Sequence, residues 1–94
     1  MAWEVLHVPG HSAGSIALYG AEKRILIPGD TVYADYAIGR FDLHSASGTA
    51  LKESLERLAG LDVDLLLPGH NRIMKGVPAG YIAETVRQWG PYLV

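Results

Sequence analysis

Three residues that can bind a metal ion follow Pro-Gly turns in this chain of 94 residues. His11 ends the segment "LHVPGH", Asp30 ends "ILIPGD", and His70 ends "LLLPGH". Two imidazoles and one carboxylate are a suitable ligand set for zinc, iron or manganese. A carboxylate also has two oxygens, so it can bridge two ions. The residue types therefore indicate a metal site for one or two ions.

Each of these turns ends an apolar run, and this suggests how the three ligands meet. Proline ends a strand because it cannot donate to the sheet, and glycine lets the backbone turn tightly. Ligands of open α/β sheets bind at the carboxyl ends of the strands. Three such ends on neighbouring strands would bring His11, Asp30 and His70 together. A single Pro-Gly turn is a common surface loop, so the expectation depends on the three occurring in one short chain.

The pattern of apolar residues predicts the elements that carry these ligands. We expect strands over 3–8, 15–20 and 23–29, because these runs are rich in residues that favour strands. The segment "GAEK" at 20–23 separates the second strand from the third and is typical of a hairpin turn. Residues 31–45 have no clean periodicity, which indicates a loop.

A helix is expected over residues 47–60. Leu51, Leu55 and Leu58 repeat at a helical spacing and would lie on one face. Ser47 precedes them as a suitable N-cap residue, because its hydroxyl can accept from the free N–H groups of the first turn.

The last third of the chain predicts one more strand and one more helix. Residues 63–69 are a short apolar run typical of a strand buried on both faces. Residues 71–76 are expected to form a short edge element, and residues 78–90 a helix with Pro78 in its first turn. The whole chain, 1–94, is then one α/β domain with a mixed sheet and two helices on one face.

Several segments of the chain resemble the second half of a metallo-β-lactamase-superfamily domain, in its glyoxalase-II-like and lactonase-like branches. These segments are "HVPGHSAGSIALYG", "RILIPGDTVY", "IGRFDL" and "LLLPGH". They occur in the order of that family and cover about residues 4 to 90. The resemblance implies half of an αββα sandwich.

The same resemblance implies a hydrolytic centre and assigns residues to it. It implies that His11 binds one metal ion and His70 the other, and that Asp30 bridges the two and serves catalysis. Ester, thioester, lactone or lactam bonds would be hydrolysed by a metal-bound hydroxide. Tyr33, Arg40 and Asp42 match positions that line the substrate pocket. Arg40 and Asp42 could equally pair with each other and hold their loop in place.

The chain departs from the family because the signature segment His-x-His-x-Asp-His is absent. Four of the family's metal ligands are therefore missing, together with half of the sheet and its helices. We expect a homodimer or higher oligomer, or a second chain that supplies the complementary half, acting on a small-molecule substrate. The alternative is a non-catalytic metal-binding or structural oligomer, a truncated relic of the hydrolase fold.

The composition supports a partner surface and argues against other classes of function. Hydrophobic residues make up 49% of the chain, which also has 11 glycines, so its apolar content exceeds the roughly 45–50% usual in soluble domains. The net charge of −2, with no basic cluster, argues against nucleic-acid binding. No apolar run is long enough for a membrane span, and residues 1–10 do not resemble a signal peptide. A cytoplasmic location is expected, since the chain has no cysteine.

Two further histidines receive weaker assignments. His7 is expected to be a half-buried structural residue, although it could serve as a surrogate ligand. His44 follows "RFDL" and is expected to be solvated in a loop. Trp3 and Trp89 are expected in the core or in an interface.

Overall fold

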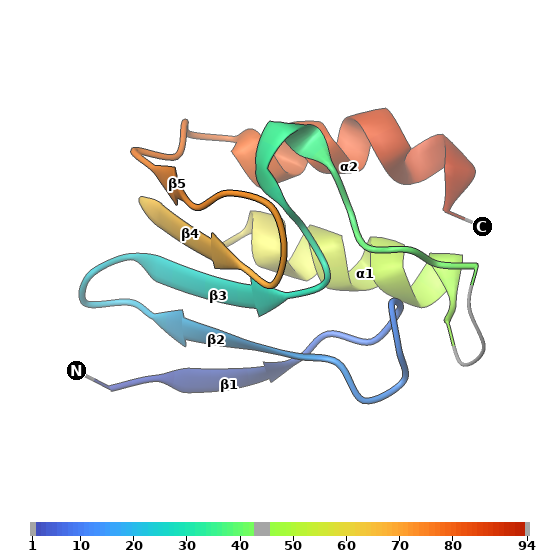
Figure 1. The fold of residues 1–94 in the computed structure, drawn as a ribbon, viewed down its shortest axis with the longest axis horizontal. Helices are drawn as coiled ribbons and strands as arrows, with labels where there is room; N and C mark the ends of the chain where they lie inside the picture. The colour runs from blue at the N-terminus through green and yellow to red at the C-terminus, as the bar shows by residue number, and fades with distance from the viewer. Residues whose placement is uncertain (1, 43–45, 94) are drawn as a thin grey trace.

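The computed structural model describes residues 2–42 and 46–93. These residues form one five-stranded mixed sheet with two helices, which confirms the predicted α/β class (Figure 1). The strands, in their order across the sheet, are β1 (Glu4–His7), β2 (Ile16–Gly20), β3 (Ile25–Gly29), β4 (Leu65–Pro68) and β5 (Met74–Lys75). The helices are α1 (Gly48–Ala59) and α2 (Tyr81–Trp89), with the short 3-10 helices η1 (Ala34–Tyr36) and η2 (Gly90–Tyr92).

The direction of the strands decides where their ends lie. Strand β2 is antiparallel to both β1 and β3, and β4 is parallel to β3. Strands β1, β3 and β4 therefore run the same way, and Figure 1 shows their arrowheads at the same end of the sheet. The loops that follow these three strands all leave from that end.

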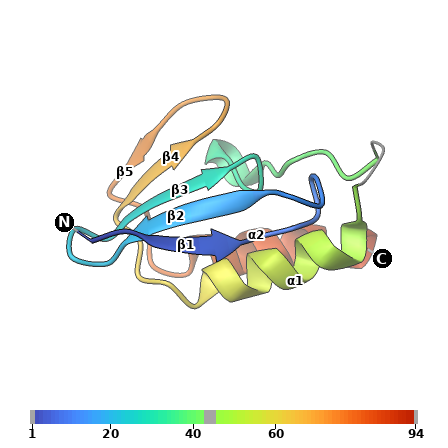
Figure 2. The same ribbon diagram turned by 90° about the horizontal axis from the view of Figure 1, so that it is seen from below.

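Both helices cover the same face of the sheet, as the edge-on view in Figure 2 shows. Alternate strand residues point into this layer, and the apolar face of α1 packs on them. The fully or almost fully buried members of this core include Leu6, Ala17, Leu26, Leu66, Leu51, Leu55 and Leu58. Each buried leucine contributes about 1.5–3 kcal/mol by removing apolar surface from water.

No helix of the described residues covers the opposite face of the sheet (Figure 2). Cross-strand pairing places Val5 beside Leu18, and Leu18 beside Ile27. Val5 is 63% exposed and Ile16 is 51% exposed. We call this row the open sheet face; by strand alternation it comprises Val5, Ile16, Leu18, Ile25, Ile27, Leu65 and Leu67.

The prediction that residues 63–69 are buried on both sides is wrong for the side that belongs to the open sheet face. Leu66 is fully buried under the helices, whereas Leu65 and Leu67 on the other side of β4 are only half-buried. The run is continuously apolar, but the described residues cover only one of its two faces.

Two other elements differ from the prediction. The expected loop at 31–45 contains η1 and an isolated bridge between Val32 and Ile38, and Val32 is fully buried. Helix α2 begins at Tyr81 instead of near Pro78, because Gly80 has a positive φ of 78° and interrupts the helical path. The predicted edge element is confirmed as β5.

None of the helices within residues 2–42 and 46–93 combines the length and the apolar character needed to cross a membrane.

Candidate metal centre

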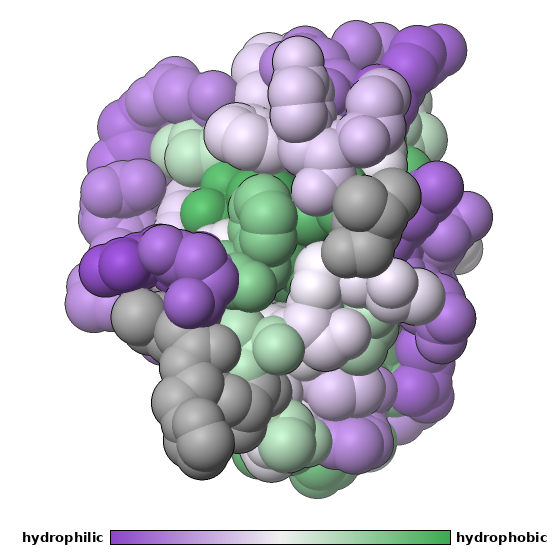
Figure 3. Space-filling view, turned by 90° about the vertical axis from the view of Figure 1, so that its right-hand side faces the viewer, coloured by the Kyte–Doolittle hydropathy of each residue, from purple (hydrophilic) through white to green (hydrophobic). Residues whose placement is uncertain are grey.

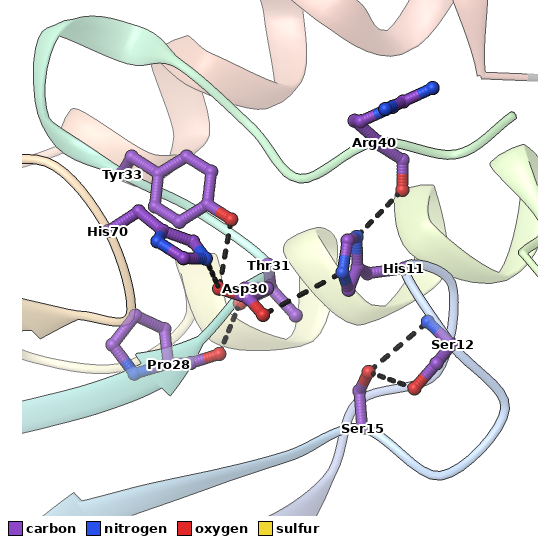
Figure 4. A network of polar contacts seen from close by, with 9 residues as sticks. All are labelled: His11, Ser12, Ser15, Pro28, Asp30, Thr31, Tyr33, Arg40 and His70. Carbon is purple, nitrogen blue, oxygen red and sulfur yellow. Dashed lines mark hydrogen bonds and ion pairs between the residues drawn. The ribbon is translucent and has the colours of Figure 1, made fainter. Parts of the chain in front are cut away.

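The three Pro-Gly turns lie together at one end of the sheet and are tied to their neighbours by backbone hydrogen bonds. The Gly69 N–H donates to the Gly29 carbonyl at 2.8 Å, which joins the turn after β4 to the turn after β3. The Ser47 N–H donates to the Gly10 carbonyl at 2.7 Å, which joins the first turn to the start of α1. At this end of the sheet His11 and His70 lie on either side of Asp30 (Figure 4).

Asp30 lies between the two histidines and turns one oxygen toward each. Its Oδ2 is 3.7 Å from Nε2 of His11, and its Oδ1 is 3.4 Å from Nε2 of His70. Both separations are longer than the 2.7–3.2 Å of an N–H···O hydrogen bond. The three side chains therefore face each other without being bonded to each other.

The orientation of His11 is set by a backbone carbonyl. Nδ1 of His11 is 2.9 Å from the Arg40 carbonyl oxygen, which can only accept, so Nδ1 carries the proton. In the neutral imidazole, Nε2 then presents its lone pair to Asp30. A lone pair and a carboxylate oxygen repel each other unless a cation lies between them, and a metal-binding histidine is typically held in this way by its second nitrogen.

The donor set fits a metal ion, and the separations fit a bridging carboxylate. Two ligand atoms on a tetrahedral ion with bonds of about 2.0–2.1 Å lie roughly 3.3 Å apart, close to the distances on both sides of Asp30. In the part of the chain that the structure describes, no group of three or more His, Cys, Asp or Glu side chains converges to hold one ion. An ion between His11 and Asp30, or one between His70 and Asp30, would have one imidazole and one carboxylate oxygen as ligands. A complete ligand shell would need further donors.

Tyr33 lies inside this centre. Its hydroxyl donates to Oδ1 of Asp30 at 3.0 Å, and its ring meets the ring of His70 edge-on, with centroids 6.0 Å apart. Burial, followed by the bond to Asp30, raises the pKa of Tyr33 to about 12, so the hydroxyl stays protonated at neutral pH. The sequence predicted Tyr33 on the substrate side, and this stays a prediction; the structure shows that its hydroxyl contacts Asp30, one of the candidate ligands.

Two of the three turn glycines, Gly29 and Gly69, are required for different local reasons. Gly29 has a positive φ of 63°, which side-chain-bearing residues rarely adopt. Gly69 is required by space, because a Cβ atom there would lie 2.5 Å from Oδ1 of Asp30. The same dipeptide thus serves a tight turn in one case and close packing against a ligand in the other.

The side chains of Arg40 and Asp42 bind each other and do not reach His11, Asp30 or His70. Two hydrogen bonds of 3.1 Å join the guanidinium to the carboxylate, and both groups are exposed. This bond lowers the pKa of the Asp42 carboxyl below its ordinary value. The contribution of Arg40 to the centre comes from its backbone carbonyl, which sequence reasoning missed because every residue has one.

The loop that carries this carbonyl also lines a hollow of about 260 Å³. Its walls are formed by Ile38, Gly39, Arg40, Phe41, Asp42 and Trp89. Figure 3 views this end of the molecule, where apolar side chains gather at the middle of the surface within a polar rim. A second hollow, of about 340 Å³, lies beside the start of α2 and contains none of the candidate ligands.

The remaining histidines and tryptophans are placed as follows. His7 is exposed, not half-buried, and its Nε2 lies 2.8 Å from the Ala13 carbonyl, so it braces the loop before β2. His44 lies outside the described residues. Trp3 is 41% exposed, whereas Trp89 is half-buried and donates from Nε1 to the Tyr36 carbonyl at 2.7 Å.

Comparisons with known proteins agree with this architecture. The model of the metallo-beta-lactamase superfamily matches residues 1–70. A relative named "Probable metallo-hydrolase MJ0888", from Methanocaldococcus jannaschii, is 40% identical over 74 residues, which cover 74% of this chain and 34% of the relative. The "Acyl-coenzyme A thioesterase MBLAC2" of Gallus gallus is 40% identical over 70 residues, which cover 70% of this chain and 24% of the relative.

A solved structure gives the same result for the fold. The crystal structure of TTHA1623 in a di-iron-bound form aligns with a TM-score of 0.76 and 37% identity, over 88% of this chain and 40% of that one. The chain thus spans between a quarter and two fifths of the proteins that it matches. The matching family model, the shared fold and the metallo-hydrolase relatives show that this chain belongs to the metallo-β-lactamase superfamily.

Proposed function

We propose that this chain is the ligand-bearing second half of a metal-dependent hydrolase that cleaves esters, thioesters, lactones or lactams. The observation that carries the proposal is the position of Asp30, which presents one oxygen to His11 and the other to His70 at 3.7 and 3.4 Å. The thioesterase relative and the metallo-hydrolase relative support hydrolysis of an acyl bond.

The metal is zinc, iron or manganese in this proposal, since nitrogen and carboxylate ligands suit all three. When bound, such ions supply Lewis acidity and lower the pKa of a water molecule, which makes it a nucleophile near neutral pH. His11 and His70 would bind metal through their Nε2 atoms, and the carboxylate of Asp30 between them would bind it as well. The Arg40 carbonyl keeps His11 in the tautomer that this task requires.

The hollow beside the loop is our candidate for the apolar part of the substrate. Phe41 and Trp89 provide aromatic walls. At the rim, the opposite charges of Arg40 and Asp42 neutralise each other. A volume of about 260 Å³ corresponds to about eight or nine water molecules, which suits a short acyl or aryl group. Arg40 and Asp42 then belong to the substrate side of the site, as the resemblance implies.

The open sheet face is where the missing half of the site would attach. Its exposed aliphatic row would be buried by a second sheet, and a stable interface needs about 800 Å² from each partner. In this proposal a second copy of the chain covers the face about a two-fold axis, which is the commonest symmetry of oligomers. The competing partner is a different chain that carries the absent His-x-His-x-Asp-His segment.

The proposal is tested by measuring mass and metal on the same sample. Size-exclusion chromatography with light scattering, followed by metal quantification of the peak, should give a dimer with bound metal. Turnover of chromogenic ester, thioester and lactone substrates should then disappear with a chelator. A monomer free of metal would contradict the proposal.

Two matched variants show whether Asp30 is responsible. Asp30→Asn should lose both bound metal and turnover, because an amide oxygen carries no charge and bridges ions poorly. Asp62→Asn is the control, since Asp62 is an exposed residue that pairs with Arg24. Metal binding without turnover in the wild-type chain would favour the non-catalytic alternative, which the incomplete ligand shell also supports.

A further inference from the structure

Tyr33 contacts two of the candidate ligands at once. Its hydroxyl donates to Oδ1 of Asp30 at 3.0 Å, and this is the oxygen that faces His70. Its ring also packs edge-on against the imidazole of His70, at an interplanar angle of 69°. The described residues place no hydrogen-bond donor on the other oxygen, Oδ2, which faces His11.

The hydroxyl is presented by a rigid support. Tyr33 is only 8% exposed, and its backbone N–H donates to the Ala37 carbonyl at 2.8 Å. Its own carbonyl accepts from the hydroxyl of Tyr81 in α2 at 2.6 Å. The Tyr81 hydroxyl in turn accepts from the Tyr36 N–H at 2.8 Å, so both ends of η1 are held by one side chain of α2.

The carboxylate of an aspartate can rotate about two side-chain bonds. A carboxylate that bridges two ions must keep one oxygen directed at each ion. The hydrogen bond at Oδ1 restricts that rotation, and in this orientation Oδ2 faces His11. Groups that hydrogen-bond a metal ligand in this way commonly change metal affinity by about 10–100-fold when they are removed.

We propose that Tyr33 is a positioning residue for Asp30, and that its hydroxyl sets the affinity of the metal position beside His70. This inference rests on the proposed function, because it assumes that Asp30 binds metal. It assigns to helix α2 a role at the centre, since Tyr81 holds Tyr33 in place.

The test compares Tyr33→Phe with Tyr36→Phe, which both delete one phenol oxygen from the same short segment. Zn²⁺ and Co²⁺ affinities of the whole chain are measured by competition with a chromogenic chelator, together with the absorption spectrum of bound Co²⁺. Tyr33→Phe should weaken binding by about tenfold and change the Co²⁺ spectrum. Tyr36→Phe should bind as the wild type does, and the urea midpoints of all three metal-free proteins should agree.

The outcomes separate this inference from the proposed function. A wild-type chain that binds no metal would overturn both. Wild-type binding with an equally tight Tyr33→Phe variant, or an equal loss in Tyr36→Phe, would overturn only the role of Tyr33. If metal-free Tyr33→Phe does not fold, Tyr81→Phe carries the test, because it keeps the hydroxyl of Tyr33 but removes its support, and a smaller loss of affinity is expected. An unchanged affinity in Tyr81→Phe would then count against the inference.

Discussion

At the scale of single residues, the site depends on uncharged groups that lie against His11 and Asp30. The Arg40 carbonyl fixes the ring of His11, and the hydroxyl of Tyr33 fixes one oxygen of Asp30. Gly69 leaves the space in which that oxygen lies. In each of these three contacts an uncharged group faces a candidate ligand, and together the three contacts decide where His11 and Asp30 point.

Gly69→Ala should disturb the centre while leaving the fold intact. The added Cβ would lie 2.5 Å from Oδ1 of Asp30, so the carboxylate must move away from His70. We expect metal affinity to fall by about tenfold or more, which chelator competition measures. Gly14→Ala is the matched control, because a Cβ there meets nothing within 4 Å. Equal affinities in the two variants would show that Asp30 tolerates the displacement.

At the scale of elements, α1 and α2 hold the turns that carry the ligands. Ser47 caps α1, since its hydroxyl accepts from the Ala50 N–H at 3.2 Å, and its backbone N–H holds the Gly10 carbonyl. Helix α2 holds η1 through the hydroxyl of Tyr81 and the indole of Trp89. Each helix therefore fixes one loop of the candidate centre in addition to covering the sheet.

Ser47→Ala should destabilise the protein by about 0.5–2 kcal/mol, which is the usual cost of losing an N-cap hydroxyl. Urea unfolding followed by circular dichroism measures the change. Thr49→Ala removes a hydroxyl from an exposed position two residues later and should leave stability unchanged or slightly raised, because alanine favours helix. Similar losses in both variants would mean that the cap itself contributes nothing.

Tyr81 should make the fold sensitive to alkaline pH. Burial is the main cause that raises the pKa of Tyr81 above its ordinary value of 10.0. An unfolded tyrosine loses its proton near pH 10, whereas the folded protein retains it, so the folded state binds more protons above that pH. The stability contributed by neutral Tyr81 is therefore complete below about pH 10 and is lost as the pH rises through the raised value.

The experiment compares urea midpoints at about pH 8 and about pH 11 for the wild type and for Tyr81→Phe. The variant should be less stable at the lower pH by about 1–3 kcal/mol, because the Tyr36 N–H and the Tyr33 carbonyl lose their partner. Its further loss on going to the higher pH should be smaller than that of the wild type. Tyr92→Phe, at a residue that is 66% exposed, should behave as the wild type. The same alkaline loss in Tyr81→Phe would rule out this origin.

At the scale of the whole molecule, the chain is a two-layer structure with one layer of helices and one sheet. The covered face contains the buried leucines, and the open sheet face is nearly as apolar. A superfamily member that spans about a third of its relatives' length would be expected to present such a face to the remainder of the fold. The candidate centre lies at the end of the same sheet (Figure 1), and the proposed function therefore assigns both the cover of this face and the further ligands to one partner.

Val5→Lys should prevent assembly on the open sheet face. Val5 is 63% exposed in the isolated chain, so lysine fits there without disturbing the core. In an assembly its charge would be buried without a partner, and this costs several kcal/mol. Light scattering should therefore report a monomer for Val5→Lys and a dimer for Ile73→Lys, whose side chain is 50% exposed outside the paired residues of the sheet. A Val5→Lys dimer would place the interface elsewhere.

Much of the fold was predictable because its signals are local. The strands at 15–20 and 23–29, and the helix with Leu51, Leu55 and Leu58, follow from alternation and helical spacing. The predicted start of α2 near Pro78 is wrong because Gly80 has a positive φ. It lies in a turn in which the Pro78 carbonyl accepts a hydrogen bond from the Tyr81 N–H. The sequence predicts a loop around Val32 because the residues there show no periodicity. Their structure depends on contacts with α2, such as the hydrogen bond from Tyr81 to the Tyr33 carbonyl.

By itself, the sequence determined which residues are candidate ligands, that each follows a Pro-Gly turn, and that more apolar surface exists than one small core can use. The tertiary structure alone decided that the three turns meet, because β1, β3 and β4 run in the same direction. It also decided that Tyr33 bonds to Asp30 and that the Arg40 carbonyl orients His11. Turns and helices depend on neighbouring residues, whereas these contacts depend on strand direction and register, which arise only when distant parts of the chain pack together.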